Sequence, residues 1–439
     1  QDMPTNNHTI ARSKYIQRGS IITSDGVTLA ESLQQEDGTY ARSYPNGNMA
    51  AHVVGYVSQQ YGTAGIESVM NDTLTGSKDY SSWNNAIASL AGQTQPGNTA
   101  KLTIDSRIQT AAEQALKGFK GAVVVMDPRT GAVLACASSP TYDNTNIDAL
   151  MQSGGGEDGS MYDRAMDALY TPGSTFKVVT LSAALETGTA SLTSTYQAPG
   201  SMDIGNAPVT NDANESYGTI SLQQAFAVSS NVVFGQVANE VGANSLVQFA
   251  NAFGYGQKLG QDLTTAASIM ADPSLMTEWE TAWAGAGQPV GMDHTPGPQT
   301  TVMQNCVIAA AIANSGVVMD PFFVSQILAP DGTVVKTTQS RSLGQAVSSA
   351  TADQVKQAML AVVQSGTGTD AQIPGVKVAG KTGSAETGGT NVNSMFVGFA
   401  PYDSPTVAIS VALEDFDKHD VEAAKIAGIV LTAALAAQG

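Results

Sequence analysis

A chain of 439 residues, 42% hydrophobic and 13% charged, has the composition of a globular protein and is too long for one hydrophobic core, so we expect two or three domains. Its 38 acidic residues outnumber 20 basic ones, and the net charge of −18 argues against a nucleic-acid partner, because phosphate binding needs clustered Lys and Arg. No run of 18 or more apolar residues occurs, so the sequence as given predicts no membrane-spanning helix.

The first hundred residues are rich in turns and in short predicted strands. Asp25-Gly26 lies between apolar stretches, which is typical of a β-hairpin. A further turn is predicted at Tyr44–Gly47. Residues 91–100 contain Gly, Pro and Asn without periodicity, so we place a domain boundary there and expect domains of residues 1–95 and 96–439.

Strand and helix patterns alternate in the second domain. Asp105 can cap a helix that ends near Leu116. Further helical patterns run from 174 to 184, from 221 to 241 and from 426 to 437. Strand patterns cover 121–126, 132–137, 376–379, 394–400 and 407–413. Strands at both ends with helices between them predict an α+β domain in which the two ends share one sheet.

Several classes of site are excluded by what the sequence lacks. Its four histidines, His8, His52, His294 and His419, form no His-x-x-x-His or His-Glu pattern, so we expect no metal site. A Gly-x-Ser-x-Gly elbow is missing, and we expect no cofactor. The general base of an enzyme built on this chain is therefore not expected to be histidine.

Both cysteines lie in apolar stretches of the sequence. Cys136 and Cys306 are therefore expected to be buried free thiols. A disulfide between them stays open, because the sequence does not place them in space.

The segment Ser174-Thr-Phe-Lys177 combines a nucleophile with a base. Pro172 and Gly173 stop the preceding chain, and Ser174 then begins an apolar helix. Residues three apart share a helix face, so the Ser174 hydroxyl and the Lys177 amine can meet. A partly desolvated lysine with a lowered pKa can serve as the base that a serine nucleophile needs. By itself the pattern also fits an N-cap serine followed by a solvated lysine.

Two further motifs follow Ser174 in the same domain. Ser229-Ser-Asn231 lies in a helical pattern; Ser82-Trp-Asn84 also fits Ser-x-Asn but precedes Ser174 and lies in the first domain. Lys381-Thr382-Gly383 lies on the late strand pair, where Gly383 would let a ligand backbone approach and Lys381 and Thr382 would meet a carboxylate. Each motif alone has an ordinary structural explanation. Together, in this order, they are the motif set of β-lactamases and penicillin-binding proteins.

The chain resembles the class B penicillin-binding proteins, of the penicillin-binding protein A type, over nearly its whole length. Beyond the three motifs, the resemblance rests on short segments: Arg18-Gly-Ser-Ile-Ile, Gly26-Val-Thr-Leu-Ala, His52-Val-Val-Gly-Tyr-Val, Gly65-Ile-Glu67, Leu74-Thr-Gly76, Thr103-Ile-Asp105 and Gly121-Ala-Val-Val-Val-Met-Asp-Pro-Arg-Thr-Gly. It implies a β-rich, non-catalytic pedestal at the N-terminus, then a transpeptidase domain with an antiparallel sheet flanked by helices and an all-helical lobe, like a serine β-lactamase.

The resemblance also implies an activity and a cellular setting. The activity is cross-linking of peptidoglycan stem peptides by a serine D,D-transpeptidase that β-lactams acylate. Its implied place is the extracytoplasmic face of the bacterial membrane, through an N-terminal anchor outside this chain. Implied partners are a membrane glycosyltransferase of the SEDS type and proteins of cell division or cell elongation.

Roles for the site residues follow from the resemblance. Lys177, held neutral by Lys381 and by burial, takes the proton of Ser174, which attacks the penultimate D-Ala carbonyl. Ser229 relays the proton to the departing D-Ala. Asn231 orients Lys177 and the substrate amide. The substrate carboxylate is bound by Thr382 beside Gly383, and backbone N–H groups of Ser174 and Ser384 hold the oxyanion.

The chain departs from the family pattern in three places. Ser384 stands where Thr is usual, which keeps a hydroxyl. Met395 stands where Trp is common, and residues 285–299 follow the family pattern loosely. The last region borders the cleft, so acceptor and β-lactam preference are left open.

Different functions can be built on the same motifs. A class A β-lactamase needs a Glu-x-x-x-Asn loop, and the one such pattern after Ser174, Glu240 to Asn244, follows Ser229 closely and is expected to be helical. A β-lactam sensor, a D,D-carboxypeptidase and a non-enzymatic scaffold of cell division are further functions that the sequence leaves open.

Overall fold

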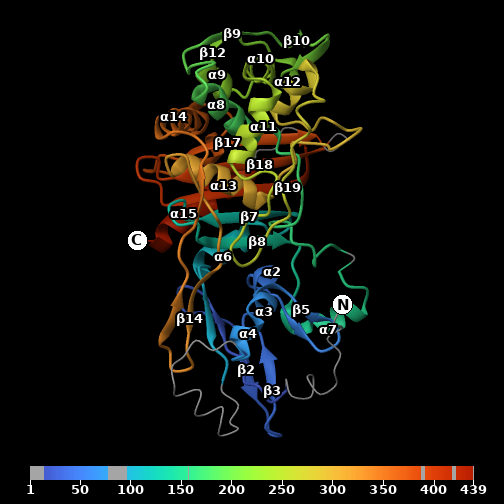
Figure 1. Ribbon diagram of the computed structural model, residues 1–439, viewed down its shortest axis with the longest axis vertical. Coiled ribbons are helices and arrows are strands. Elements are labelled where there is room, and N and C mark those ends of the chain that lie inside the picture. The colour runs from blue at the N-terminus through green and yellow to red at the C-terminus, as the bar shows by residue number, and fades with distance from the viewer. Residues whose placement is uncertain (1–13, 78–95, 157, 387–390, 418–421, 439) are drawn as a thin grey trace.

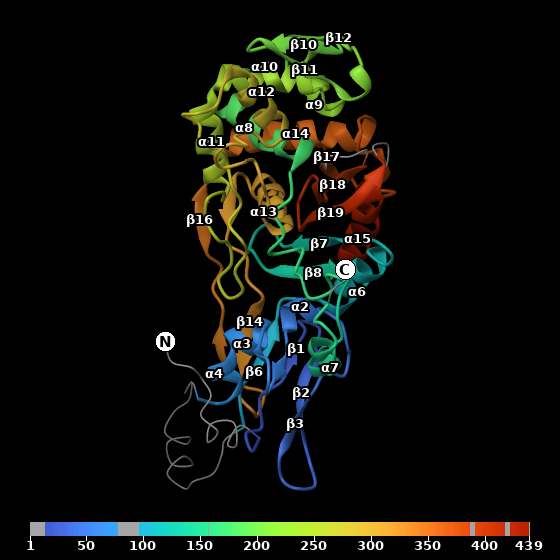
Figure 2. The ribbon, with the colours of Figure 1, turned by 90° about the vertical axis from the view of Figure 1, so that its right-hand side faces the viewer.

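The computed structural model describes residues 14–77, 96–156, 158–386, 391–417 and 422–438. Figure 1 shows an elongated molecule with the strands of the first hundred residues at one end and a group of helices at the other. A five-stranded sheet lies between them (Figure 2). Within the described ranges, each helix is too short or too polar to cross a lipid bilayer.

The sheet at the N-terminal end confirms the predicted hairpin and adds strands from far along the chain. Its order is β15-β14-β6-β1-β2-β3, with only β1 and β6 parallel. The strands are β1 (Ile21–Ile22), β2 (Thr28–Gln34), β3 (Tyr40–Ser43), β6 (Thr99–Leu102), β14 (Val324–Leu328) and β15 (Val334–Thr337). The excursion that returns through β14 and β15 was not predicted. The chain therefore leaves this end of the molecule after β6 and comes back to it before its last strands.

Short elements cover this sheet. They are α2 (Ala51–Val54), β4 (Val57–Ser58), β5 (Gly62–Thr63), α3 (Gly65–Val69) and α4 (Asn71–Leu74). Glu67 of α3 has no exposed surface, and its two carboxylate oxygens lie 2.6 Å from Arg18 Nε and 2.5 Å from Arg42 Nε. A buried carboxylate between two arginines fixes three separate segments of this end to one another.

The central sheet confirms that the two ends of the second domain share one sheet. Its order is β17-β18-β19-β7-β8, antiparallel throughout. The strands are β7 (Gly121–Met126), β8 (Val133–Ser139), β17 (Ala379–Glu386), β18 (Asn391–Ala400) and β19 (Val407–Asp417). Every residue of β7 is buried, because both faces of the sheet are covered by helices. This explains a strand with continuous rather than alternating hydrophobicity.

Alternate residues of β7 face two separate cores. Val123 and Val125 pack with α6 (Ser106–Ala115) and α15 (Glu422–Gln438), and Val124 packs on the other face with α13 (Val302–Ala313). The Asp105 carboxylate accepts the Arg107 N–H and caps α6, as predicted. Helix α13 is buried at all twelve positions, since it lies between the sheet and the helical lobe.

The helical lobe completes the α+β architecture. Its helices are η2 (Gly173–Phe176), α8 (Lys177–Glu186), α9 (Leu222–Ala227), α10 (Asn231–Val241), α11 (Ala243–Ala252), α12 (Glu278–Ala286) and α14 (Ser349–Ser365). Two antiparallel strand pairs border it: β9 (Thr195–Ala198) with β12 (Gly218–Ser221), and β10 (Ser201–Ile204) with β11 (Ala207–Thr210). A last pair, β13 (Val317–Met319) and β16 (Ser342–Gln345), lies beside α13.

Several predicted boundaries were wrong. The helix expected over 221–241 is two helices, because Ser229 and Ser230 leave the helical conformation. The strand expected over 376–379 starts only at Ala379 and continues to Glu386. Glu240 and Asn244 lie in different helices, separated by Gly242.

Both cysteines are buried free thiols, as predicted. Cys136 is 4% exposed and Cys306 is fully buried, and no disulfide joins them. Burial raises the pKa of both thiols.

Candidate active site

Ser174 lies in a tight turn where the sheet meets the helical lobe. Gly173 has φ of 54°, a conformation that favours glycine, and a Cβ there would lie 2.5 Å from the Ser384 carbonyl oxygen. The turn continues as the 3₁₀ helix η2 and then as α8, which begins at Lys177. Strand β17 therefore packs directly against the turn that carries the serine.

Lys177 is fully buried, and its amine contacts Ser174, Ser229 and Asn231. Its Nζ lies 3.0 Å from Ser174 Oγ, 2.7 Å from the Ser229 carbonyl oxygen and 2.7 Å from Asn231 Oδ1. The carbonyl and amide oxygens can only accept, so a neutral amine gives its two protons to them. The remaining lone pair then faces the Ser174 hydroxyl, which is the arrangement that a general base needs.

Ser229 lies in the break between α9 and α10. Its φ is 63°, outside the helical region, and Ser230 next to it caps α10 by accepting the Val233 N–H at 3.2 Å. The Ser229 hydroxyl lies 2.9 Å from Lys381 Nζ and 3.3 Å from Lys177 Nζ. The helix break, which the sequence did not predict, thus puts one hydroxyl between the two lysines.

The orientation of the Asn231 amide is fixed from outside the site. Asn231 is the first residue of α10, and its Nδ2 donates to the Thr210 carbonyl oxygen at 3.0 Å. Its Oδ1 must therefore point the other way, toward Lys177. The β10–β11 hairpin, which contains Thr210, supports the base through this amide.

Strand β17 brings the Lys-Thr-Gly segment to the same place. Lys381 is fully buried, and Nζ also donates to the Thr382 carbonyl oxygen at 3.0 Å. The Thr382 hydroxyl pairs with that of Thr367, which follows α14, while Ser384 is exposed. A Cβ on Gly383 would lie 2.8 Å from Thr175 Cγ2 and 2.9 Å from the Pro172 carbonyl oxygen. Close packing of the strand against the Ser174 turn is thus a reason for this glycine.

Burial sets the charge states of the two lysines. Desolvation lowers the pKa of Lys177 well below the usual lysine value, and the neighbouring Lys381 lowers it further. Desolvation also lowers the pKa of Lys381 to about 7. Lys177 therefore loses its proton more readily than an ordinary lysine, as a general base must. Lys381 can change its charge near neutral pH.

The structure brings together all the residues expected in the site: Ser174, Lys177, Ser229, Asn231, Lys381, Thr382, Gly383 and Ser384. It adds residues that the sequence did not indicate. Thr367 gave no motif signal, and Asn305, which contacts Thr175, was overlooked although it is an amide within an apolar helix. Met395 is buried on β18 opposite Gly383, so its thioether belongs to the core.

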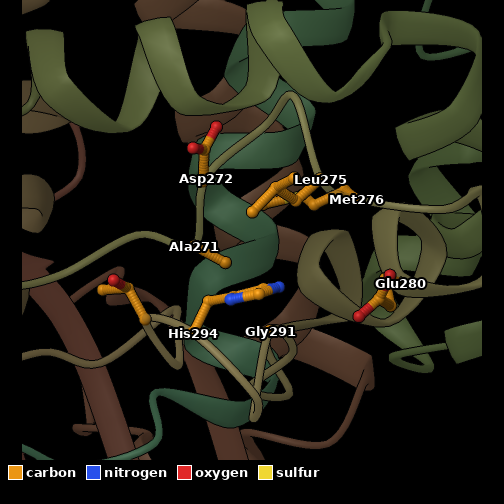
Figure 3. Close-up of a pocket in the computed structure, with 8 residues that line it drawn as sticks. Ala271, Asp272, Leu275, Met276, Glu280, Gly291 and His294 are labelled. Atoms are coloured by element: carbon orange, nitrogen blue, oxygen red, sulfur yellow. The ribbon is translucent and has the colours of Figure 1, made fainter.

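The region of residues 285–299 contains a small cavity beside α12. Ala271, Asp272, Glu280 and His294 are among its lining residues (Figure 3). Its volume is about 20 Å³, enough for a water molecule or two and far below that of a peptide site. This cavity is therefore not a substrate site.

Comparison with known proteins agrees with this geometry. Residues 121–435 match the penicillin-binding protein transpeptidase domain, and residues 18–100 match the penicillin-binding protein A dimerisation domain. The peptidoglycan D,D-transpeptidase PbpA of Mycolicibacterium smegmatis is 32% identical, over 93% of this chain and 86% of that protein.

Solved structures give the same result. The D,D-transpeptidase domain of a peptidoglycan glycosyltransferase from Eggerthella lenta superposes with a TM-score of 0.89 at 43% identity, covering 97% of this chain and 99% of that one. Penicillin-binding protein A from M. tuberculosis, in a ceftriaxone acyl-enzyme complex, superposes with a TM-score of 0.88 at 31% identity and the same coverage. The chain therefore belongs to the penicillin-binding protein transpeptidase family.

Proposed function

We propose that this protein is a peptidoglycan D,D-transpeptidase that uses Ser174 as its nucleophile and is acylated by β-lactams. The observation that carries the proposal is the buried amine of Lys177, which has two acceptor-only partners and the Ser174 hydroxyl as its third neighbour. A neutral amine that donates to both of these acceptors keeps its lone pair for a hydroxyl, and the Ser174 hydroxyl at 3.0 Å is nearer to it than the Ser229 hydroxyl at 3.3 Å.

Acylation begins when Lys177 accepts the Ser174 proton. The serine oxygen then forms a bond to the penultimate D-Ala carbonyl carbon of a stem peptide. As that carbonyl becomes an oxyanion, backbone N–H groups of Ser174 and Ser384 are the proposed donors to it. The bond to the terminal D-Ala breaks as the tetrahedral intermediate collapses, and an acyl ester remains on Ser174.

The leaving D-Ala needs a proton on its nitrogen. Ser229 is the proposed relay, because its hydroxyl lies between the two lysine amines at 2.9 and 3.3 Å. Lys381 and Thr382 are the proposed partners of the substrate carboxylate, and Gly383 keeps β17 close to the serine turn. An amine from a second stem peptide then attacks the ester, forms the cross-link and releases Ser174.

Acylation by β-lactams follows from the same geometry, since a strained lactam carbonyl can take the place of the D-Ala–D-Ala amide. Penicillin-binding protein A from M. tuberculosis has been solved as acyl-enzyme complexes with ceftriaxone, imipenem and penicillin G. A β-lactamase would also have to hydrolyse this ester. Glu240 and Asn244, the one pair of this spacing after Ser174, lie in separate helices, and Glu240 accepts the Tyr196 hydroxyl at 2.8 Å.

The rest of the chain fits a membrane-bound cell-wall enzyme in this proposal. We assign residues 1–95 to a non-catalytic pedestal and 96–439 to the transpeptidase domain. The protein would be held at the extracytoplasmic face of the membrane by an N-terminal anchor outside this chain, with a SEDS-type glycosyltransferase as its partner.

The test is a reaction with a stem pentapeptide that ends in D-Ala–D-Ala, with and without an acceptor amine. The proposal predicts released D-Ala together with an amide-linked dimer, both absent for Ser174→Ala. Release of D-Ala without any dimer, at saturating acceptor, would make the protein a D,D-carboxypeptidase. Absence of any product, combined with full complementation of a deletion strain by Ser174→Ala, would make it a scaffold.

A further inference from the structure

The turn that carries Ser174 is held from behind by a side chain of the central helix. Asn305, in the first turn of α13, is 4% exposed, and its Nδ2 donates to Thr175 Oγ1 at 3.4 Å. Its Oδ1 accepts the Thr300 hydroxyl at 3.2 Å. The Thr175 hydroxyl donates in turn to the Pro172 carbonyl oxygen at 2.7 Å. A chain of three polar contacts thus runs from α13 to the residues on both sides of Ser174.

The direction of these contacts is determined by the chemistry of the groups. Because Thr175 gives its proton to the Pro172 carbonyl, its oxygen is left as an acceptor, and the Asn305 amide must present its nitrogen. The amide oxygen then faces the Thr300 hydroxyl, which can donate. An amide within a helix that is buried at all twelve positions is costly unless both of its ends are satisfied.

The other side of the turn is held by backbone atoms. Gly173 N donates to the Gly287 carbonyl oxygen at 3.0 Å, and Gly383 of β17 packs against Thr175. The turn is therefore confined between β17 and the loop at Gly287 on one side and Asn305 on the other. Loss of the Asn305 contact would free Thr175 to move, and Ser174 with it.

We propose that Asn305 is a positioning residue for acylation: through Thr175 it fixes the Ser174 hydroxyl against the Lys177 amine. The inference rests on the proposed function, in which Ser174 is the nucleophile. Proton transfer requires the 3.0 Å separation between Ser174 Oγ and Lys177 Nζ to be kept within a few tenths of an ångström. A displacement of about 1 Å can lower a rate by about 100-fold, so a smaller shift is expected to cost about tenfold.

The test compares Asn305→Leu, Thr175→Val and the double variant with the wild type. The second-order rate constant of acylation by benzylpenicillin is measured at 25 °C as a function of pH, per active site. We expect each single change to lower it about tenfold and the double variant to be no slower than either single one, since both remove the same contact. The inflection of the pH profile is expected to stay unchanged, because the surroundings of the lysines are kept.

Two controls separate positioning from general stability. Thr103→Val removes another buried hydroxyl, which lies away from the site and donates to the Val133 carbonyl oxygen at a distance of 2.5 Å. This substitution should leave the rate constant of acylation unchanged. Thr175→Ser keeps the hydroxyl and should restore the wild-type rate. This pair of Thr175 variants also tests the inference if Asn305→Leu does not fold.

Each other outcome counts against the inference. Equal acylation of wild type and the Asn305→Leu and Thr175→Val variants would overturn it while leaving the proposed function intact. A double variant whose acylation rate constant falls by the product of the two single losses would also overturn it. So would a Thr103→Val variant whose acylation is slowed as much as that of Asn305→Leu or Thr175→Val. A wild-type chain that benzylpenicillin does not acylate would overturn the proposed function, and this inference with it.

Discussion

Replacing Asn231 by Asp tests directly whether Lys177 is the base. The substitution keeps the shape of the side chain and puts a negative charge 2.7 Å from Lys177 Nζ, where the amide oxygen now lies. A carboxylate at that distance stabilises the ammonium form, so the pKa of Lys177 must rise. The free amine, which accepts the Ser174 proton, is then present only at higher pH.

The size of the effect follows from the separation. A pair of unit charges at this distance is worth about 6 kcal/mol at an effective dielectric constant of about 20. Asn231 is half-buried, so we take about half of that, roughly 3 kcal/mol, or about two pKa units. The rising limb of the pH–rate profile should therefore shift to higher pH by about two units. At pH values below this limb, acylation of the variant should be about 100-fold slower than that of the wild type.

The measurement is the rate constant of acylation by benzylpenicillin between pH 5 and pH 10. Asn239→Asp is the matched control, because it makes the same change on the same helix about 12 Å further along its axis. At that distance in water the interaction is about 0.3 kcal/mol, and the limb should move by less than half a pH unit. A limb that stays in place in Asn231→Asp would refute the assignment of Lys177 as the base.

Three further predictions concern packing and stability. Gly383→Ala should slow acylation at least tenfold, because the new Cβ atom would displace the turn that carries Ser174. Gly428 lies within α15, where a Cβ atom meets only ordinary contacts, so Gly428→Ala should raise the free energy of unfolding by about 0.5–1 kcal/mol. Glu67→Gln should lower the free energy of unfolding by about 3–5 kcal/mol, since two arginines would lose their buried counter-charge; denaturation showing under 1 kcal/mol would contradict this. Cys136 and Cys306 should react with a thiol reagent only after unfolding, and labelling of the native protein at the rate of free cysteine would show that they are accessible.

The site was predictable where short-range helix geometry determines it. Ser174 and Lys177 are three residues apart and meet because both lie on one helical turn, where η2 runs into α8, and the apolar pattern after Lys177 indicates this helix. The other two motifs of the site were assigned through the resemblance to a known family, which rests on the order of the three motifs along the chain. Sequence alone did not place Ser229, because its contact with both lysines depends on a helix break that an apolar pattern on either side conceals.

The start of strand β17 and the pairing of strands distant in the chain could not be predicted from the sequence. Strand β17 consists largely of Gly, Ala, Ser and Thr, so its hydrophobic periodicity is weak, and its start was placed too early. The return of β14 and β15 to the N-terminal sheet depends on pairing between residues more than 200 positions apart, such as Val324 with Leu102. Alternating patterns specify that a strand has two faces, but they do not identify its partner.

Intact-mass spectrometry after incubation with benzylpenicillin tests the central claim most directly. The account predicts one persistent adduct on the wild-type protein, located on the peptide that contains Ser174, and none on Ser174→Ala. An adduct that survives in Ser174→Ala would contradict the assignment of the nucleophile. Penicillin consumed without any adduct would contradict the proposed transpeptidase and indicate a β-lactamase.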